Sequence, residues 1–428
     1  MALRVGVFHP GTQHSWQTAL AFQESGQLAW YATSIFYDPE RWPYRVERWL
    51  PGPLGARTRR EFLRRYTPRL DQRLIRRLGF WEWPLTVPRR LNRMRLERAL
   101  YRRAVREFGD RVVRLIEHEP VDVLWGYNTS SLEVFRWAKA RGILCILDQT
   151  IGHPRAQDAI MLREQQRHPE FFSEPYLPFS AEEIERTDEE LALADKVVAW
   201  SEFSKQTLVD NGCPAEKIEI VPYGADEAIF PKSRPQHAPP VGRPVDFLFA
   251  GAIHPRKGVA YLLQAFAGIP REEARLTLLG KPYIPAATFA RYRDRVRHVP
   301  HVPRAEVVQH FLAADCFVFP SLFEGSAIVL REACSAALGI IQSANAGDGV
   351  RDGRNGIVLE EVSVDHVRRA VETVLADRGR LADWQAASWE IGRQLTTAHY
   401  RDIVRAKVNA LKLALNSALA ACLLLWTM

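Results

Sequence analysis

The chain has 428 residues, 47% of them hydrophobic and 25% charged, and a formal net charge of +8. This balance is typical of a soluble globular protein, and the length is too great for one ordinary core, so two domains are expected. Five scattered cysteines (Cys145, Cys213, Cys316, Cys334 and Cys422) form no CxxC pair. They argue against a disulfide framework or a zinc site, and they fit a reducing, cytoplasmic location.

Neither end of the sequence shows a membrane signal. The start, MALRVGVFHPG, predicts a strand and a turn, and it lacks the charged and long apolar regions of a signal peptide. The final segment, LKLALNSALAACLLLWTM, is apolar but is interrupted by Lys412 and Asn416. The clean run after Asn416 is shorter than the ~20 residues that a spanning helix needs. We therefore expect no signal peptide and no transmembrane helix.

In the first half of the chain, short apolar runs alternate with helical patterns. Apolar residues recur at steps of three and four between residues 96 and 116, as in a helix with one buried face. Strands are expected at 3–9, 28–33, 121–127, 143–148 and 196–201. This alternation favours parallel sheets covered by helices on both faces.

The positive charge is concentrated in residues 41–106. This segment has 20 arginines, no lysine and five acids, a net charge of +15, which leaves −7 for the rest of the chain. The arginines are mixed with Trp42, Trp49, Phe62, Tyr66, Phe80, Trp81 and Trp83. Three interpretations remain open: a solvated, salt-bridged helical face, docking on an anionic membrane surface, and nucleic-acid binding. The last is disfavoured because no nucleic-acid-binding motif accompanies the arginines.

The second half repeats the strand–helix pattern after a break. Residues 227–244 contain five prolines and no periodicity, which indicates an interdomain linker. Further strands are expected at 245–251, 275–280, 296–302, 316–321 and 338–343, and the pattern after about residue 378 is helical.

These elements predict two Rossmann-like α/β domains that face a central cleft. The N-terminal domain covers 1–226 with the arginine-rich insertion at 41–106, and the linker covers 227–244. The C-terminal domain covers 245–377, and helices at 378–428 are expected to pack back on the N-terminal domain.

The stretch FLFAGAIHPRKGVAYLLQAF (247–266) predicts an anion site. A strand ends at Gly251 and a helix begins near Gly258, so free backbone N–H groups and the helix dipole favour negative charge at the junction. Arg256 and Lys257 add positive charge there. Two interpretations are open: a diphosphate held by the backbone and Lys257, or an ordinary loop with surface cations.

The stretch PSLFEGSAIVLREACS (320–335) repeats this strand–turn–helix geometry and carries two glutamates. Glu324 lies beside the helix start, and Glu332 is eight residues on, about 80° further round the helix. The two carboxylates cannot meet, but they could touch one extended ligand, and carboxylates suit vicinal hydroxyls. The alternative is that Glu324 stabilises the helix start while Glu332 pairs with an arginine. The glycine-rich stretch AGDGVRDGRNGIVL (346–359) could close such a site.

Taken in order, these motifs resemble the retaining, nucleotide-sugar-dependent glycosyltransferases of the GT-B fold, in particular glycosyltransferase family 4. The resemblance is carried by FAGAIHPRKG, LTLLG, HVPRAEVVQHFLAADCFVFPS, FEGSAIVLREA and DGRNGIVL, and more loosely by LALADKVVAWSEFSKQTLVDNG and KIEIVPYGADEAIF. It implies transfer of a sugar to a glycan or glycolipid acceptor with retention, without a metal or other cofactor.

The resemblance also implies roles for single residues. Glu324 and Glu332 match the family's E-x7-E pair, with Glu332 on the nucleotide ribose and Glu324 by the donor sugar. Lys257, supported by Arg256, matches the lysine on the donor diphosphate. The loop residues expected to face the donor are Gly325, Ser326, Ala327, Gly251 and, in the first domain, Gly11.

Three positions depart from the family pattern. The usual arginine after the first glycine loop is Ala252, and Arg256 could supply that charge from another position. The usual Phe-Gly after the first Glu-Gly is Ser326-Ala327, and the glutamate expected before DGRNG is Asp348. These departures predict an altered donor choice or a weak enzyme.

The first-domain side of the site rests on histidines. Related enzymes carry a histidine after a central strand, and His153 follows such a strand in ILCILDQTIGHPRAQ. We expect it in the active site, the alternative being a structural or solvated loop histidine. His14 is a less favoured candidate.

We expect a cytoplasmic protein, with a nucleotide sugar and a glycan or lipid-linked acceptor as partners and no nucleic acid. Docking on the inner face of the membrane through anionic lipid stays one of the open interpretations. Two alternatives remain: a non-catalytic sugar-nucleotide-binding partner of a glycan assembly complex, and an epimerase or hydrolase on the same fold.

Overall fold

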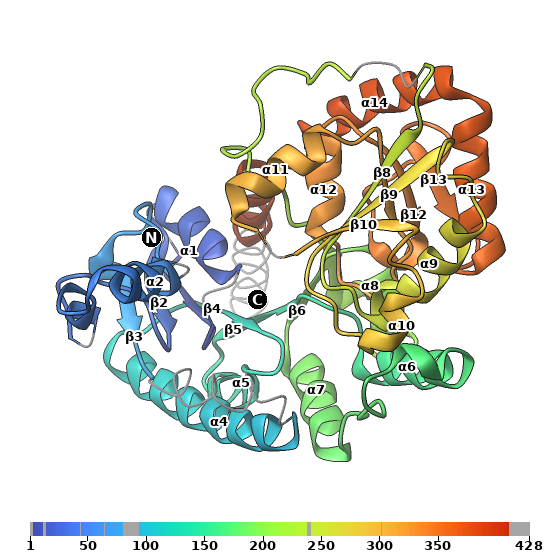
Figure 1. Cartoon of the computed structure of the whole chain (residues 1–428). Coiled ribbons are helices and arrows are strands. Elements are labelled where there is room, and N and C mark those ends of the chain that lie inside the picture. Colours follow the sequence, from blue (N-terminus) through green and yellow to red (C-terminus); the bar gives the residue numbers. More distant parts are fainter. Residues whose placement is uncertain are drawn as a thin grey trace. The chain divides into compact units, whose positions relative to one another are not determined.

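The chain contains two parallel α/β sheets and two compact units. The computed structural model describes residues 3–11, 14–42, 44–63, 65–79, 94–237, 241–300 and 302–410. The first unit comprises the described residues of Met1–Asp148, Glu185–Val198 and Arg401–Met428. The second comprises those of Gln149–Ile184 and Ala199–Tyr400. Figure 1 follows the elements along the sequence.

The first sheet has seven strands in the order β3-β2-β1-β4-β5-β6-β7. Its pairings from β3 to β5 are parallel, as the strand–helix alternation predicts. The strands are β1 (Val5–Phe8), β2 (Leu28–Thr33), β3 (Ile75–Arg77), β4 (Val123–Tyr127), β5 (Leu144–Gln149), β6 (Lys196–Ala199) and β7 (Ile218–Ile220). The accompanying helices are α1 (Ser15–Glu24), η1 (Tyr44–Arg48), α2 (Gly52–Leu63), η2 (Gln72–Leu74), α4 (Met94–His118), α5 (Leu132–Lys139) and α7 (Ala181–Leu193).

All five strands expected in the first half are present. The three-residue strands β3 and β7 were not predicted, because a run so short shows no periodicity. Helix α4 buries Val105, Phe108 and Val112 as expected, but Leu96 at its start is 53% exposed. The apolar face predicted for residues 96–116 is therefore buried only further along the helix.

The arginine-rich segment is partly built into the first unit. Arg76 bonds Glu119 through two nitrogens at 2.7 and 2.8 Å, and Arg77 lies 3.5 Å from Asp38. The aromatic residues divide: Tyr44 and Phe62 are buried with Ile35 and Tyr37. In contrast, Trp42 and Trp49 are exposed at 70% and 72%. Phe80, Trp81 and Trp83 lie outside the described residues.

The second sheet is parallel throughout, in the order β10-β9-β8-β11-β12-β13. Its strands are β8 (Val245–Ala250), β9 (Ala274–Leu279), β10 (Val296–Val299), β11 (Cys316–Phe319), β12 (Gly339–Ser343) and β13 (Gly356–Leu359). The helices of the second unit are α6 (Pro154–Arg167), η3 (Pro169–Phe171), α8 (Glu202–Val209), η4 (Ala215–Lys217), η5 (Pro255–Lys257), α9 (Val259–Ala267), α10 (Ala286–Ala290), α11 (Arg304–Leu312), α12 (Ile328–Ser335), η6 (Ala344–Ala346), α13 (Val364–Ala376) and α14 (Arg378–Gly392).

The strand order reverses between β8 and β11. From β8 the chain continues outward through β9 and β10, whereas from β11 it continues through β12 and β13 in the other direction. Helices α9 and α13 pack together, as do α12 and α14, and Figure 1 shows the two pairs on opposite sides of the sheet. In open parallel sheets such a reversal leaves a crevice at the carboxyl ends of the strands, where ligands bind.

The two Rossmann-like α/β sheets expected from the sequence are thus confirmed. The domain boundaries drawn from the sequence remain predictions. Residues 411–428, where part of the C-terminal helical tail was expected, lie outside the described residues. Among the helices that the structure describes, none has both the length and the apolar character needed to cross a membrane.

One buried carboxylate fixes the start of both central strands of the second sheet. Asp315, directly before β11, accepts bonds from two Arg243 nitrogens at 2.7 and 2.8 Å and from the Asp246 backbone N–H of β8 at 2.8 Å. Its side chain is only 3% exposed, so these donors replace its lost hydration.

We predict that Asp315→Ala lowers the free energy of unfolding by about 3 kcal/mol, because Arg243 loses two charge-assisted hydrogen bonds and the Asp246 N–H loses its acceptor. Urea denaturation measures the change. The matched control is Glu372→Ala on the exposed side of α13, which should cost below about 0.5 kcal/mol. Equal midpoints for the two variants would contradict this account.

Candidate functional site

The candidate site lies where β8 and β11 end, and a glycine allows the two ends to meet. Gly258 has φ +68°, and a Cβ placed on it would lie 1.9 Å from the carbonyl oxygen of Pro320. Across this contact, the Arg256 carbonyl accepts from the Leu322 N–H at 2.8 Å and from the Ser321 hydroxyl at 3.1 Å. The loop that carries Lys257 is therefore fixed against the loop that carries Glu324.

Glu324 is buried among donors. Its Oε1 accepts from the Lys257 ammonium and from the Ser321 hydroxyl at 2.8 Å, and Arg256 Nη1 lies 3.3 Å away. Burial by itself would raise the pKa of Glu324, but the charges of Lys257 and Arg256 and these hydrogen bonds outweigh it and hold the pKa below its usual value. Glu324 is therefore a carboxylate at neutral pH.

Lys257, the partner of Glu324, is largely buried and lies near an aromatic ring. Its side chain is 14% exposed, and its Nζ lies 5.2 Å from the centroid of the Phe319 ring. Burial lowers the pKa of Lys257, while the Glu324 charge opposes that shift. An anionic ligand at this place would have to share Lys257 with Glu324 or take it from Glu324.

His254 belongs to the same loop as Arg256 and Lys257, but its side chain is neutral. Burial, followed by the charges of Arg256 and Lys257, lowers the pKa of His254 to about 4. The ring is thus uncharged at neutral pH, and Nδ1 accepts from the Arg256 N–H at 3.1 Å, which caps η5.

The small residues after Glu324 make packing contacts and hydrogen bonds within the second unit. A Cβ on Gly325 would lie 1.8 Å from the Thr150 carbonyl oxygen, so no other residue fits. The Ser326 hydroxyl accepts from the buried Arg331 at 2.9 Å. The Ala327 N–H donates to the Ala346 carbonyl at 2.9 Å. Close packing within the second unit therefore accounts for Gly325, whether or not a ligand also approaches.

Glu332 lies in a separate pocket of about 310 Å³, and its side chain is 2% exposed. Arg304 donates to Oε1, whereas no donor among the described residues reaches the buried Oε2. The pocket is lined by Ala250, Gly251, Ala252, Leu279, Gly280, Lys281, Tyr283, Val302, Arg304, Val307, Val329 and Glu332. One oxygen of a carboxylate that lines a concave, partly apolar pocket thus has no donor among the described residues.

Glu332 pairs with an arginine, as one of the two interpretations expected, and no donor among the described residues reaches its other oxygen. Its contact with a ligand stays a prediction. The sequence reasoning did not identify Arg304, although it stands in the motif HVPRAEVVQHF.

The positions that depart from the family pattern lie in different places. Ala252 lines the Glu332 pocket, whereas Arg256 lies at Glu324 and donates to the Phe323 carbonyl. That Arg256 supplies the charge of an arginine at position 252 stays a prediction. Asp348 accepts from the Glu202 N–H at 3.1 Å.

His153 is fully buried at the start of α6 in the second unit. Its Nδ1 accepts from the Arg155 N–H at 3.2 Å as the helix cap, and its own N–H donates to the Thr207 hydroxyl at 3.0 Å. It follows the Thr150 carbonyl that packs on Gly325 by three residues, so the chain carries it close to the Glu324 loop. The observed contacts show a structural role for this ring.

Gly11 and His14 belong to the first unit, after β1. The Gly11 carbonyl accepts from the Ser15 hydroxyl at 3.3 Å and lies 2.6 Å from His9 Nδ1. Burial, with the nearby His9, lowers the pKa of His14 to about 4, so His14 is neutral at neutral pH.

The two parallel sheets and the paired loops at the switch point define the class: this is the GT-B fold, with two Rossmann-like α/β domains. Sucrose-phosphate synthase from Thermosynechococcus elongatus superposes with a TM-score of 0.64 at 15% identity, over 97% of this chain and all of that one. Anabaena HepE, solved with UDP-glucose, superposes with a TM-score of 0.60 at 14% identity, over 95% and 100%.

Residues 230–389 match the model of the glycosyl transferases group 1. A D-inositol 3-phosphate glycosyltransferase of Kineococcus radiotolerans is 30% identical over 219 residues, 44% of this chain and 50% of that protein. A GDP-mannose-dependent alpha-(1-6)-phosphatidylinositol monomannoside mannosyltransferase of Mycobacterium tuberculosis is 29% identical over 236 residues, 50% and 60% of the two chains. The chain thus spans half to three fifths of the length of these curated relatives.

We predict that Gly258→Ala destabilises the protein by about 3 kcal/mol or more, because it adds a clash with Pro320 to the left-handed backbone. Gly242→Ala is the matched control: Gly242 has φ +71° and no heavy atom within 4 Å of the place that a methyl group would take, so it should cost only about 1 kcal/mol. Denaturant unfolding of both variants measures the difference. Similar losses would show that the contact between the two loops does not constrain the site.

Proposed function

We propose that this protein is a glycosyltransferase that moves a sugar from a nucleotide-sugar donor to a glycan or glycolipid acceptor, with retention and without a metal. The observation that carries the proposal is that Glu324 and Glu332, which lie where the strand order of the second sheet reverses, differ in how fully they are hydrogen-bonded. Oε2 of Glu332 has no donor among the described residues, whereas Glu324 is bonded to cations. An extended donor would use the first for its ribose and the second for its sugar end.

The donor nucleoside would occupy the Glu332 pocket. Ribose hydroxyls would donate to Oε2 of Glu332, which relieves the cost of a buried carboxylate oxygen without a donor. Gly251 and Gly280 on the pocket wall let the backbone approach a ligand closely. The diphosphate would then extend toward Lys257 and Arg256 at the end of β8.

The chemistry follows from the charges at Glu324. As the sugar–phosphate bond breaks, Lys257 and Arg256 would stabilise the negative charge that grows on the leaving diphosphate. The Glu324 carboxylate would stabilise positive charge on the sugar ring, because its cationic neighbours keep it ionised. A leaving phosphate oxygen would take the proton of the acceptor hydroxyl, so the step needs no metal and no further cofactor.

His153 stays in the proposal as a residue at the sugar end of the donor. Its Nδ1 caps α6. Gly325, Ser326 and Ala327 would present their backbone to the donor sugar. That Gly11 of the first unit faces the donor stays a prediction from the sequence.

A second candidate function rests on Ala252. This small side chain lines the Glu332 pocket where the family usually has an arginine, so one phosphate contact is missing. A non-catalytic sugar-nucleotide-binding subunit would bind donors without turning them over. An epimerase or a hydrolase would instead form product when no acceptor is present.

We predict that Glu332→Gln weakens nucleotide binding at least tenfold, because a charge-assisted hydrogen bond to ribose is worth about 1.5–3 kcal/mol. A thermal-shift screen with UDP, GDP, ADP and their sugars identifies the nucleotide, since a ligand of the folded state raises its stability. Calorimetry then compares the variant with wild type. The control is Glu306→Gln on α11, an exposed acid outside the pocket, which should bind normally. Unchanged affinity in Glu332→Gln would refute the assignment.

The first unit supports a further part of the proposal, peripheral docking on an anionic membrane from the cytoplasmic side. The Trp42 and Trp49 rings are exposed, 6.2 Å apart, within the arginine-rich segment. Leu54 on α2 is 52% exposed as well. Exposed indoles among basic side chains suit the headgroup region of a bilayer.

We predict that the protein binds vesicles containing phosphatidylglycerol and that raising salt from 0.1 to 1 M releases it, since the Debye length falls from about 10 to 3 Å. The double variant Trp42→Ala, Trp49→Ala should lose most of this binding in a co-sedimentation assay. Trp137→Ala is the control, because this half-buried ring lies under Arg141 instead. Equal binding to neutral phosphatidylcholine vesicles, or none to anionic ones, would rule out the docking.

A further inference from the structure

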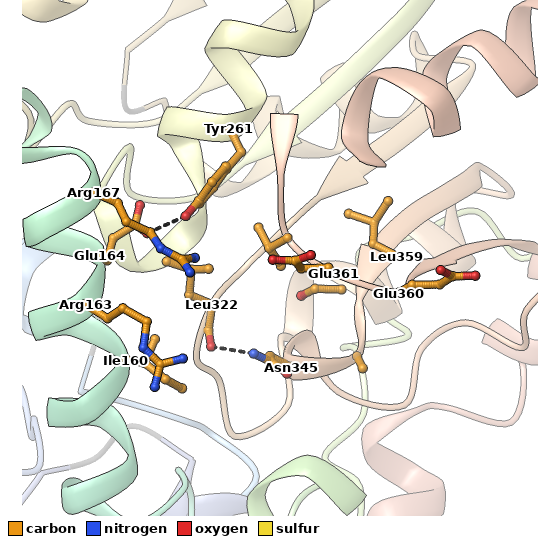
Figure 2. A pocket seen from close by; sticks show the side chains of 13 residues that line it. Ile160, Arg163, Glu164, Arg167, Tyr261, Leu322, Asn345, Leu359, Glu360 and Glu361 are labelled. Carbon is orange, nitrogen blue, oxygen red and sulfur yellow. Dashed lines mark hydrogen bonds between the residues drawn. The ribbon is translucent and has the colours of Figure 1, made fainter. Parts of the chain in front are cut away.

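A second hollow of about 270 Å³ lies in the second unit, and it shares no lining residue with the Glu332 pocket. It is bounded by α6, the first turn of α9 and the segments that follow β12 and β13 (Figure 2). Its lining residues are Ile160, Arg163, Glu164, Arg167, Tyr261, Leu322, Ser343, Ala344, Asn345, Leu359, Glu360, Glu361 and Val362. The size is near the low end for small-molecule sites, and it suits a single ring.

Glu164 is the buried polar group of this hollow. Glu164 is 3% exposed, and its Oε2 accepts from the Tyr261 hydroxyl at 2.7 Å. Within the described part of the chain, no donor reaches Oε1. A carboxyl oxygen buried without a partner costs on the order of 1–3 kcal/mol, and a ligand that bonds it would recover that free energy.

The protonation of Glu164 indicates which kind of group would bond it. Burial raises the pKa of Glu164 to about 7, against the opposing effects of the Tyr261 hydrogen bond and the Arg167 charge. Both protonation states are therefore populated near neutral pH. A hydroxyl suits either state because it both donates and accepts, whereas a cation would suit only the carboxylate.

The rest of the lining offers both polar and apolar surface. Figure 2 shows Arg163 and Arg167 reaching into the hollow from α6, with Glu361 on the opposite wall. Asn345 lies below Leu322 in that view, and its amide donates to the Leu322 carbonyl at 2.8 Å. The apolar part of the wall comes from Ile160, Leu322, Leu359 and Val362.

This lining matches an uncharged ring that carries hydroxyls. Planar guanidinium and carboxyl groups bond vicinal hydroxyls, and the apolar wall can cover the C–H face of a ring. Two arginines are balanced by Glu360 and Glu361, so the charge does not favour a free anion. We propose that this hollow is a carbohydrate-binding site that takes one uncharged sugar ring, separate from the donor site. The proposal uses none of the donor-site residues and holds whether or not the proposed transfer reaction is correct.

Saturation-transfer NMR on the full chain tests the proposal, with methyl glycosides of glucose, galactose, mannose and N-acetylglucosamine as probes. We expect at least one to bind, and Glu164→Leu and Arg167→Ala each to weaken it about tenfold, the value of one hydrogen bond of about 1.4 kcal/mol. Arg155→Ala on the same helix is the matched control, because Arg155 does not line the hollow, and it should bind normally.

Two further variants and a second probe complete the test. If Glu164→Leu does not fold, Arg167→Ala and Ala344→Trp decide, since both positions are exposed and the indole should block the hollow. A sugar held in the Glu332 pocket would be unaffected by these substitutions, and that result would overturn the proposal. No binding of any glycoside, or Arg167-dependent binding of inorganic phosphate in place of sugar, would overturn it too.

Discussion

The candidate site depends on one buried ion pair, Lys257 with Glu324. Removing both charges from water is costly, and the cost is met only because the pair is close and further donors surround it. The Gly258–Pro320 contact brings the two loops near enough for the pair to form. The ion pair thus holds the ends of β8 and β11 together. A ligand phosphate bound there would compete with Glu324 for Lys257.

The three buried glutamates of the second unit differ in how far the protein satisfies them, and this difference suggests their roles. Glu324 accepts from several donors and stays ionised, which suits electrostatic stabilisation in place. Glu332 and Glu164 each have one bonded oxygen and one without a partner among the described residues. An incompletely bonded carboxyl in a hollow is a feature expected of a binding site, because the ligand completes the set.

Much of the fold could be predicted from the sequence, because buried parallel strands are continuous apolar runs that stand out between helical patterns. The strands β3 and β7 escaped prediction because three residues carry no period, and Leu96 was assigned to a face that is exposed there. The resemblance indicated Glu324, Glu332 and Lys257 as a set. Arg304 was missed, since one arginine in a charged chain carries no signal until its partner is known.

The sequence by itself determined the class of fold and the residues at the strand ends, because both follow from local pattern and spacing. Only the tertiary structure decided which groups meet: that Arg256 lies at Glu324, and that Gly325 is required by the Thr150 carbonyl. It also placed Glu164 against Tyr261, 97 residues further along the chain. Such pairings depend on how strands and helices pack across the sheet, and no local stretch of sequence encodes that packing.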